Sequence, residues 1–171
     1  MNKKTLNAMW DHVRQLNGIT MRCVEALSED TLDSHPIPKM RTPKELVAHM
    51  YLVLKNSAEG VVSGTIAETD DISALPRITN KQELLAYCRQ CWAAADRAVQ
   101  ATTDAQLVSM VETPWDMTFP GFVSFSVIQD EFLHHRGQLY TYLRAMGREV
   151  PNMWDFAGNA PEFQPRQEQQ A

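Results

Sequence analysis

Apolar residues recur at intervals of three and four along four long segments of the chain, a spacing typical of amphipathic helices. The first covers residues 3–26, the second starts at Thr42-Pro43 and ends between Gly60 and Gly64, the third covers about 80–101, and the fourth about 124–146. No segment of similar length alternates between apolar and polar residues, and the sequence has no internal repeat. The pattern predicts an all-α fold, an up-and-down four-helix bundle in which each helix buries one apolar stripe.

Capping residues mark where several of these helices begin and end. Thr42-Pro43-Lys44-Glu45 combines a Thr cap, Pro at the first helical position and Glu at the third, so a helix should start there. Asn80 followed by Glu83 predicts another start. Gly147, with Pro151 shortly after it, predicts the end of the last helix.

The connections between these helices differ in character. Residues 28–38 are polar and contain prolines, so we expect an ordered connector, and residues 64–79 form a polar loop long enough to act as a lid or a dimer contact. Residues 104–110 are expected to add one or two helical turns. Residues 111–121 are rich in proline and aromatic residues and cannot form a regular helix, so their aromatic side chains should pack across the end of the bundle.

Composition places the chain among soluble globular proteins. With 171 residues, 44% hydrophobic and 22% charged, it is long enough for one domain, which we assign to residues 1–158, with 159–171 as a flexible tail. The net charge of −5 argues against a nucleic-acid partner. No apolar run is long enough to span a membrane and no secretory signal is evident, so a cytoplasmic location is expected.

The cysteines are Cys23, Cys88 and Cys91, an odd number that favours reduced thiols over a disulfide framework. Cys88 and Cys91 have CxxC spacing. They lie within a predicted helix and no second pair accompanies them. We interpret them as small buried side chains one turn apart, and not as a redox or zinc motif.

Polar residues interrupt the apolar stripe of the last helix. On a helical wheel Ile128, Phe132, Leu139 and Met146 fall within about 40° of one another and define the core-facing direction. His135 lies about 20° from that direction and Glu131 about 60°. These two residues are four apart, so both should point inward as a stacked pair, whereas Asp130 and His134 should face solvent or another subunit.

A buried carboxylate beside a buried imidazole is costly unless the two groups pair or bind a cation. One interpretation is a Glu131–His135 pair that fixes helix packing. The other is a metal site, which needs a further ligand from elsewhere in the fold. His49 lies on or beside the buried stripe of the second predicted helix, so it is the other histidine that we expect to be buried.

Two motifs resemble one known family. The run His134-His135-Arg136-Gly137-Gln138-Leu139, followed by Gly147 and Pro151, looks like the last-helix signature of the DinB/YfiT-like superfamily of four-helix-bundle metalloproteins. Residues 40–49, Met-Arg-Thr-Pro-Lys-Glu-Leu-Val-Ala-His, resemble the second-helix entry of that superfamily. The likeness covers roughly residues 5–155.

The resemblance implies a divalent metal held by one His of the second helix and two of the last helix, four residues apart. Carried over by position, the ligands are His49, Glu131 and His135, with Glu131 where the family usually has His. Two imidazoles and a carboxylate are a known set for catalytic zinc and non-haem iron. The ion could be zinc, nickel, iron or manganese. The extra negative charge should raise the pKa of a bound water relative to a three-His site.

Several neighbours of these residues have candidate roles. Gln138 could hydrogen-bond to a metal-bound water or orient a ligand carboxylate, or it could serve only in packing. Tyr142 could donate a hydrogen bond into the pocket or lie in the core with its hydroxyl satisfied. Gly137 faces away from the core, where close approach by a partner subunit would explain it. Arg136 and Arg144 are expected to be surface or interface cations.

The resemblance implies a metal-dependent thiol S-transferase or hydrolase that acts on a small electrophile, with a low-molecular-weight thiol as a possible partner and a homodimer as the assembly. A non-catalytic, stress-related binding or scaffold bundle with a degenerate metal site is the alternative. A di-iron site would need a second Glu-x-x-His motif, which the sequence lacks. The pocket lining would come from Trp10, Met50, Trp115, Phe119 or Trp154, and periodicity does not select among them.

Overall fold

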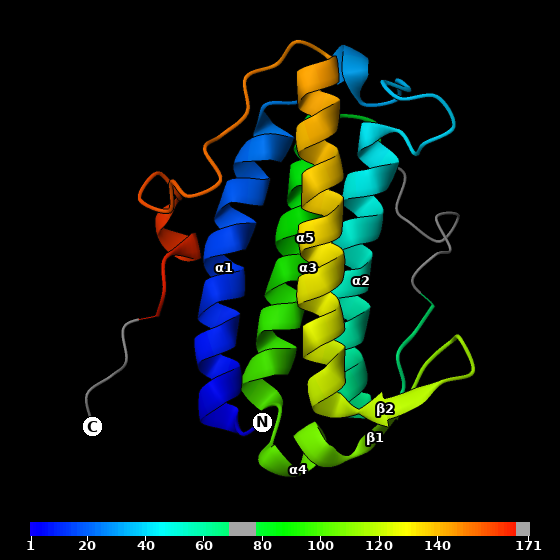
Figure 1. The fold of residues 1–171 in the computed structure, drawn as a ribbon, viewed down its shortest axis with the longest axis vertical. Helices are drawn as coiled ribbons and strands as arrows, with labels where there is room; N and C mark the ends of the chain where they lie inside the picture. The colour runs from blue at the N-terminus through cyan, green and yellow to red at the C-terminus, as the bar shows by residue number, and fades with distance from the viewer. Residues whose placement is uncertain (69–77, 167–171) are drawn as a thin grey trace.

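Four long helices form a bundle in the computed structural model, which describes residues 1–68 and 78–166 (Figure 1). The predicted helical bundle is confirmed. The helices and strands are α1 (Lys3–Glu25), α2 (Pro43–Ser63), α3 (Lys81–Ala101), α4 (Asp104–Val108), β1 (Met110–Glu112), β2 (Thr118–Pro120) and α5 (Gly121–Ala145), with short 3-10 turns η1 (Glu29–Thr31) and η3 (Pro161–Phe163). No helix of the described residues is both long and apolar enough to cross a membrane.

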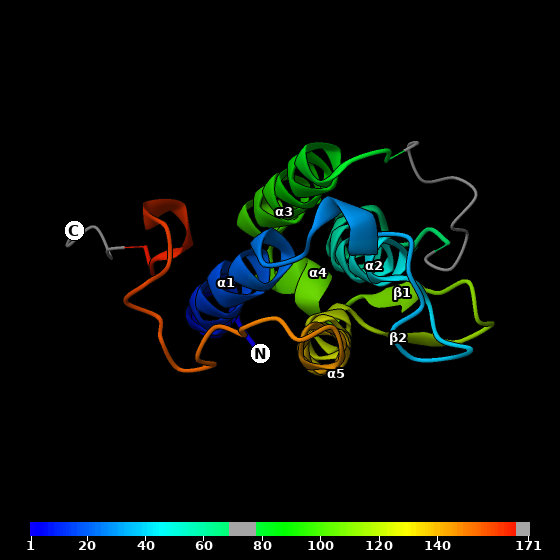
Figure 2. The same cartoon turned by 90° about the horizontal axis from the view of Figure 1, so that it is seen from above.

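The four long helices surround one core. Helix α2 packs against α3 and α5, and α1 packs against the same two, so α1 and α2 lie diagonally across the bundle (Figure 2). The predicted core residues Ile128, Phe132 and Leu139 are buried, and Met146 is half-buried. This arrangement brings one face of α5 directly against α2.

Helices α1 and α5 run in one direction, and α2 and α3 run in the other (Figure 1). Lys81, at the start of α3, donates to the carbonyl of Leu27 beyond the end of α1, at 3.0 Å. At the opposite end Gln106 donates to the carbonyl of Val62 near the end of α2, at 3.1 Å. The neighbours α2 and α3 are therefore parallel, where strict alternation would make them antiparallel. The long connection between them permits this, and its residues 69–77, within the loop expected to act as a lid or dimer contact, lie outside the described residues.

The predicted starts of α2 and α3 are confirmed by capping hydrogen bonds. The Thr42 hydroxyl accepts from the Glu45 amide at 3.2 Å, and the Glu45 carboxylate accepts from the Thr42 amide at 2.9 Å. Asn80 caps α3 by accepting from the Glu83 amide at 2.9 Å. The Glu83 carboxylate accepts from Thr79, one residue before the cap.

The aromatic segment before α5 is a short hairpin. Strands β1 and β2 pair antiparallel, with Val111 opposite Phe119. The absence of a regular helix is confirmed, but Trp115 lies in the turn between the strands with 43% of its surface exposed and does not cover the end of the bundle. Helix α5 begins at Gly121, three residues earlier than predicted. A side chain at Gly121 would collide with the backbone of Gln106.

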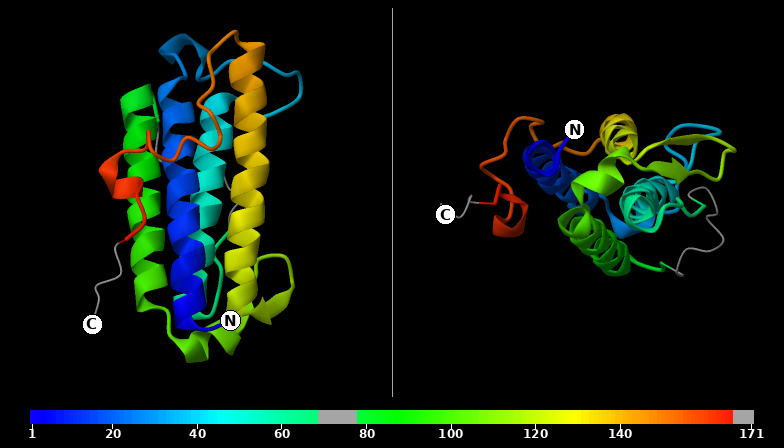
Figure 3. Two further views of the ribbon diagram at one scale, coloured as in Figure 1. Left: turned by 60° about the vertical axis from the view of Figure 1, so that its left-hand side comes forward. Right: turned by 90° about the horizontal axis from the view of Figure 1, so that it is seen from below.

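The chain beyond residue 158 does not leave the bundle at once, contrary to the expected flexible tail. Asn159 and Phe163 are buried, and Asn159 donates to the Gln15 carbonyl at 2.8 Å. The Phe163 ring meets the Trp92 ring edge to face. Residues 159–166 therefore lie against α1 and α3 (Figure 3). A Gly-, Pro- and Gln-rich composition does not reveal these long-range contacts.

All three cysteines are free and buried, as expected for structural thiols. Burial raises the pKa of the Cys23 thiol to about 11, and it also raises the pKa values of Cys88 and Cys91. The Cys88–Cys91 pair therefore consists of protonated side chains in the core at neutral pH.

Candidate metal centre

Two buried histidines meet where α5 crosses α2. His49 and His135 are 6% and 5% exposed, and their ring centroids lie 4.9 Å apart with the planes at 82°. One turn before His135 on the same helix, the Glu131 side chain is 44% exposed. Helical periodicity predicted that Glu131 and His135 both point inward. This is confirmed for His135, whereas Glu131 lies about 60° from the core direction and remains partly exposed at the edge of the bundle. The structure brings His49 to the same face.

His49, Glu131 and His135 each offer one ligand atom, and these atoms lie within 4.8 Å of one another. The Nε2 atom of His135 is 3.1 Å from Oε2 of Glu131. Zinc binds such atoms at about 2.0–2.2 Å, which corresponds to ligand atoms roughly 3–4 Å apart. Small side-chain rotations would therefore bring all three atoms into one coordination sphere. It is the only such group of three His, Cys, Asp or Glu residues within 1–68 and 78–166.

Gln138 determines which ring nitrogen of His135 carries the proton. Its Oε1 lies 3.0 Å from Nδ1 of His135, and its Nε2 lies 3.0 Å from Nε2 of His134. With Gln138 donating to His134, its oxygen accepts the Nδ1 proton of His135. The Nε2 atom of a neutral His135 then presents a lone pair toward the Glu131 carboxylate. Two acceptors at this separation require a proton or a metal ion between them.

Among residues 1–68 and 78–166, His135 is the one basic side chain that pairs with Glu131. None of the lysines or arginines that the structure describes forms an ion pair with it. The carboxylate lies at the mouth of the site, beside two buried imidazoles. Such a site is closed on the core side and accessible through Glu131.

Other predicted residues lie elsewhere. The Tyr142 hydroxyl donates to the Arg41 carbonyl at 2.7 Å, so Tyr142 has the core role and not the pocket role. Asp130 and His134 are exposed, as expected of the outward face. Arg136 is only 8% exposed, which contradicts its assignment as a surface cation. Cys23 of α1 and Tyr140 of α5 lie near its guanidinium.

Of the residues suggested as pocket lining, none contacts the cluster through an observed interaction. Trp10 is buried and stacks on Trp92, with ring centroids 5.1 Å apart. Met50 is in the core, and Trp154 is 71% exposed and lines a cavity on another side of α5.

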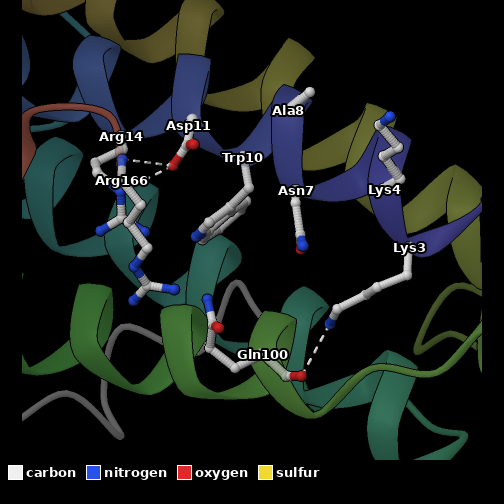
Figure 4. Close-up of a pocket in the computed structure, with 9 residues that line it drawn as sticks. All are labelled: Lys3, Lys4, Asn7, Ala8, Trp10, Asp11, Arg14, Gln100 and Arg166. Carbon is white, nitrogen blue, oxygen red and sulfur yellow. Dashed lines mark hydrogen bonds and ion pairs between the residues drawn. The ribbon is translucent and has the colours of Figure 1, made fainter. Parts of the chain in front are cut away.

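A separate hollow lies beside the first half of α1 (Figure 4). Its walls carry four cationic side chains, and at least three of them have partners. Arg14 and Arg166 both bind Asp96, and Lys3 donates to the Gln100 carbonyl at 2.9 Å. These contacts tie α1 to α3 and to the C-terminal segment. The hollow does not resemble a metal centre.

Comparison with solved structures identifies the same fold in several proteins. A DinB-like protein from Bacillus subtilis superimposes with a TM-score of 0.72 at 19% identity, covering 85% of this chain and 97% of its own. A putative DinB-family member from Exiguobacterium sibiricum gives 0.69 at 21%, covering 88% and 96%. YfiT from Bacillus subtilis gives 0.65 at 15%, covering 86% and 89%, and is described as a probable metal-dependent hydrolase with an unusual four-helix bundle topology. No curated protein matches the chain.

The family signature extends over nearly the whole sequence. A profile describing the DinB family matches residues 1–167, which include both helices of the His49–Glu131–His135 cluster. The two motifs that suggested the resemblance lie on α2 and α5, the helices that meet at this cluster. The chain belongs to the DinB family.

Proposed function

We propose that the protein is a metal-dependent enzyme in which His49, Glu131 and His135 hold one divalent ion. The observation that carries the proposal is the convergence of three ligand atoms from two helices within 4.8 Å. Two buried imidazoles beside a carboxylate are costly to assemble for packing alone, because polar groups lose hydration when they are buried. A divalent cation would interact favourably with all three side chains at once.

The donor set fits the proposed ion. Two imidazole nitrogens and one carboxylate oxygen suit zinc, iron, nickel or manganese, and three protein ligands leave positions for a substrate or a nucleophile. When bound, such an ion acts as a Lewis acid and lowers the pKa of a coordinated water or thiol.

The protein supplies orientation and charge around the ion. Gln138 accepts the Nδ1 proton of His135 and thereby directs the Nε2 lone pair toward the cluster. Glu131 contributes a negative charge that a third imidazole would lack. Its exposed side gives a small electrophilic substrate a route to the site, while the buried histidines exclude water from the other side.

Hydrolysis is the reaction type that the comparisons favour, because YfiT, which shares the fold, is described as a probable metal-dependent hydrolase. Transfer of a low-molecular-weight thiol to a small electrophile is the second candidate, since the same open site would activate a thiol by the same means. Turnover of an activated ester with and without added thiol would separate the two reactions.

Metal analysis of the purified protein tests the proposal independently of activity. We expect close to one equivalent of a divalent metal in the wild type and a small fraction of that in His49→Ala and His135→Ala. His12→Ala is the matched control, because His12 lies on α1 and outside the cluster. Equal, near-zero metal content in all four proteins, even after incubation with zinc, nickel, iron(II) and manganese, would contradict the proposal and favour a non-catalytic bundle.

A further inference from the structure

Arg136 is a buried cation on α5. It is 8% exposed, and its Nη1 atom has no hydrogen-bond partner. Among the residues that the structure describes, no carboxylate forms an ion pair with its guanidinium. Leaving a charged group buried and unpaired costs several kcal/mol. Such a group points to a partner that comes from outside the chain.

The nearest titratable groups do not supply the missing charge. Arg136 lies close to Cys23 and Tyr140, and burial raises the pKa of both, to about 11 and about 12. Both are neutral near pH 7. The Tyr140 hydroxyl donates to the Pro151 carbonyl at 2.8 Å, which fixes the ring beside the guanidinium.

Arg136 lines a cavity of about 560 Å³ between α5 and residues 150–154. The walls are mostly apolar and aromatic, with Arg144 at the rim over the Tyr140 ring. The lining residues that matter here are Leu133, Gly137, Val150, Met153 and Trp154. Leu133 precedes His135 by two residues and therefore faces about 160° away from it. The cavity and the proposed metal centre occupy opposite sides of α5.

The hollow beside α1 provides a contrast within the same molecule (Figure 4). There Arg14 is as buried as Arg136, but it binds Asp96 at 2.6 Å and Asp11 at 3.4 Å. The protein thus pairs one buried arginine with its own carboxylates and leaves the other, which lines a cavity, without a carboxylate partner among the described residues. From this difference we infer that the cavity lined by Arg136 accepts an anion from outside the chain.

We propose that this cavity is a binding site for a small organic carboxylate with an apolar body. The planar guanidinium matches a carboxylate and can donate two parallel hydrogen bonds to it. Of the two arginines that line the cavity only Arg136 is buried, and one buried cation suits a monoanion better than phosphate. The side chains of Leu133, Val150 and Met153 would cover the apolar part, with Trp154 at the opening. The site is independent of the metal centre.

Calorimetric titration with benzoate tests the proposal, with benzamide as the neutral probe of the same shape. We expect benzoate to bind the wild type at least tenfold more tightly than benzamide or inorganic phosphate. Arg136→Met should lose this binding and unfold at a higher temperature without ligand, because it removes an unpaired buried charge. Arg89→Met, which replaces a half-exposed arginine on α3, is the control and should bind benzoate like the wild type.

Gly137→Leu keeps Arg136 and tests the cavity itself. Gly137 is an exposed helical residue, and a Cβ atom added to it would meet no other atom within 4 Å, so leucine should fold there and fill the space. We expect it to weaken benzoate binding at least tenfold. Equal binding of benzoate and benzamide, tighter binding of phosphate, or unchanged binding in both variants would overturn the proposal. So would a wild-type dimer that Arg136→Met dissociates, because the partner would then be a second copy.

Discussion

Nε2 of His135 lies 3.1 Å from Oε2 of Glu131, one helical turn earlier on α5, while Nδ1 of the same ring faces Gln138. The ring is therefore held from both sides, with its proton directed to Gln138 and its lone pair to the cluster. This relationship distinguishes a prepared ligand from a histidine that merely fills the core.

Removing the Gln138 contact should weaken metal binding without removing a ligand. In Gln138→Leu, the Nδ1 proton of His135 loses its acceptor, and loss of such a contact typically lowers metal affinity by about 10–100-fold. Gln138→Glu keeps an acceptor and should retain the affinity of the wild type or exceed it. Competition with a chromophoric chelator measures both. Identical affinities for Gln138→Leu and the wild type would show that Gln138 serves only in packing.

Replacing Glu131 separates its role as a ligand from its role in helix packing. Glu131→His introduces the residue that the resemblance to the DinB/YfiT-like superfamily implies at this position. We expect this variant to keep its metal affinity within about tenfold of the wild type. Glu131→Ala should lose most of the affinity. Chelator competition again provides the measurement. If both variants bind as tightly as the wild type, Glu131 is not a ligand.

Several features of this centre could be predicted from the sequence because they are local. The positions of Glu131 and His135 on one face follow from helical geometry, and the Thr42–Glu45 cap follows from four consecutive residues. The burial of Arg136 could not be foreseen, because it depends on tertiary contacts, such as the proximity of Cys23 on α1, which is distant in the sequence. The parallel order of α2 and α3 was also missed, since apolar periodicity shows which face of a helix is buried but not the direction of its neighbours.

Two glycines inside helices should respond in opposite ways to the same substitution. Gly18 faces the Asn159 side chain so closely that a methyl group would overlap it, whereas a methyl group at Gly137 would meet no atom within 4 Å. Gly137→Ala should raise the free energy of unfolding by about 0.5–1 kcal/mol, because alanine is the better helix former. Gly18→Ala should lower it by about 1 kcal/mol or more, because it breaks the Asn159–Gln15 hydrogen bond.

Urea denaturation measures both effects. A stabilised Gly18→Ala would mean that the segment from Asn159 to Phe163 does not dock on α1 as the structure shows. A destabilised Gly137→Ala would mean that another backbone, such as that of a partner subunit, packs against Gly137.

The Cys23 thiol should make stability fall at alkaline pH. Its pKa rises from an ordinary value of 9.0 to about 11 in the folded protein, chiefly through burial. Folding therefore favours the protonated form. The contribution of Cys23 to stability is complete below pH 9 and is lost as pH rises through about 11. The loss is on the order of 2 kcal/mol.

Comparison with Cys23→Ala isolates this effect. Between pH 9 and 11 the free energy of unfolding of the wild type should fall more steeply than that of the variant, whatever their difference at neutral pH. Parallel pH profiles would show that the Cys23 thiol titrates in the folded protein at its ordinary pKa.

An anomalous difference map from crystals grown with zinc, recorded on both sides of the zinc absorption edge, would locate the ion bound by His49, Glu131 and His135. We expect one strong peak at about 2.0–2.2 Å from the ligand atoms of His49, Glu131 and His135. An empty map at this position, in crystals where zinc occupies other sites on the protein, would contradict this expectation.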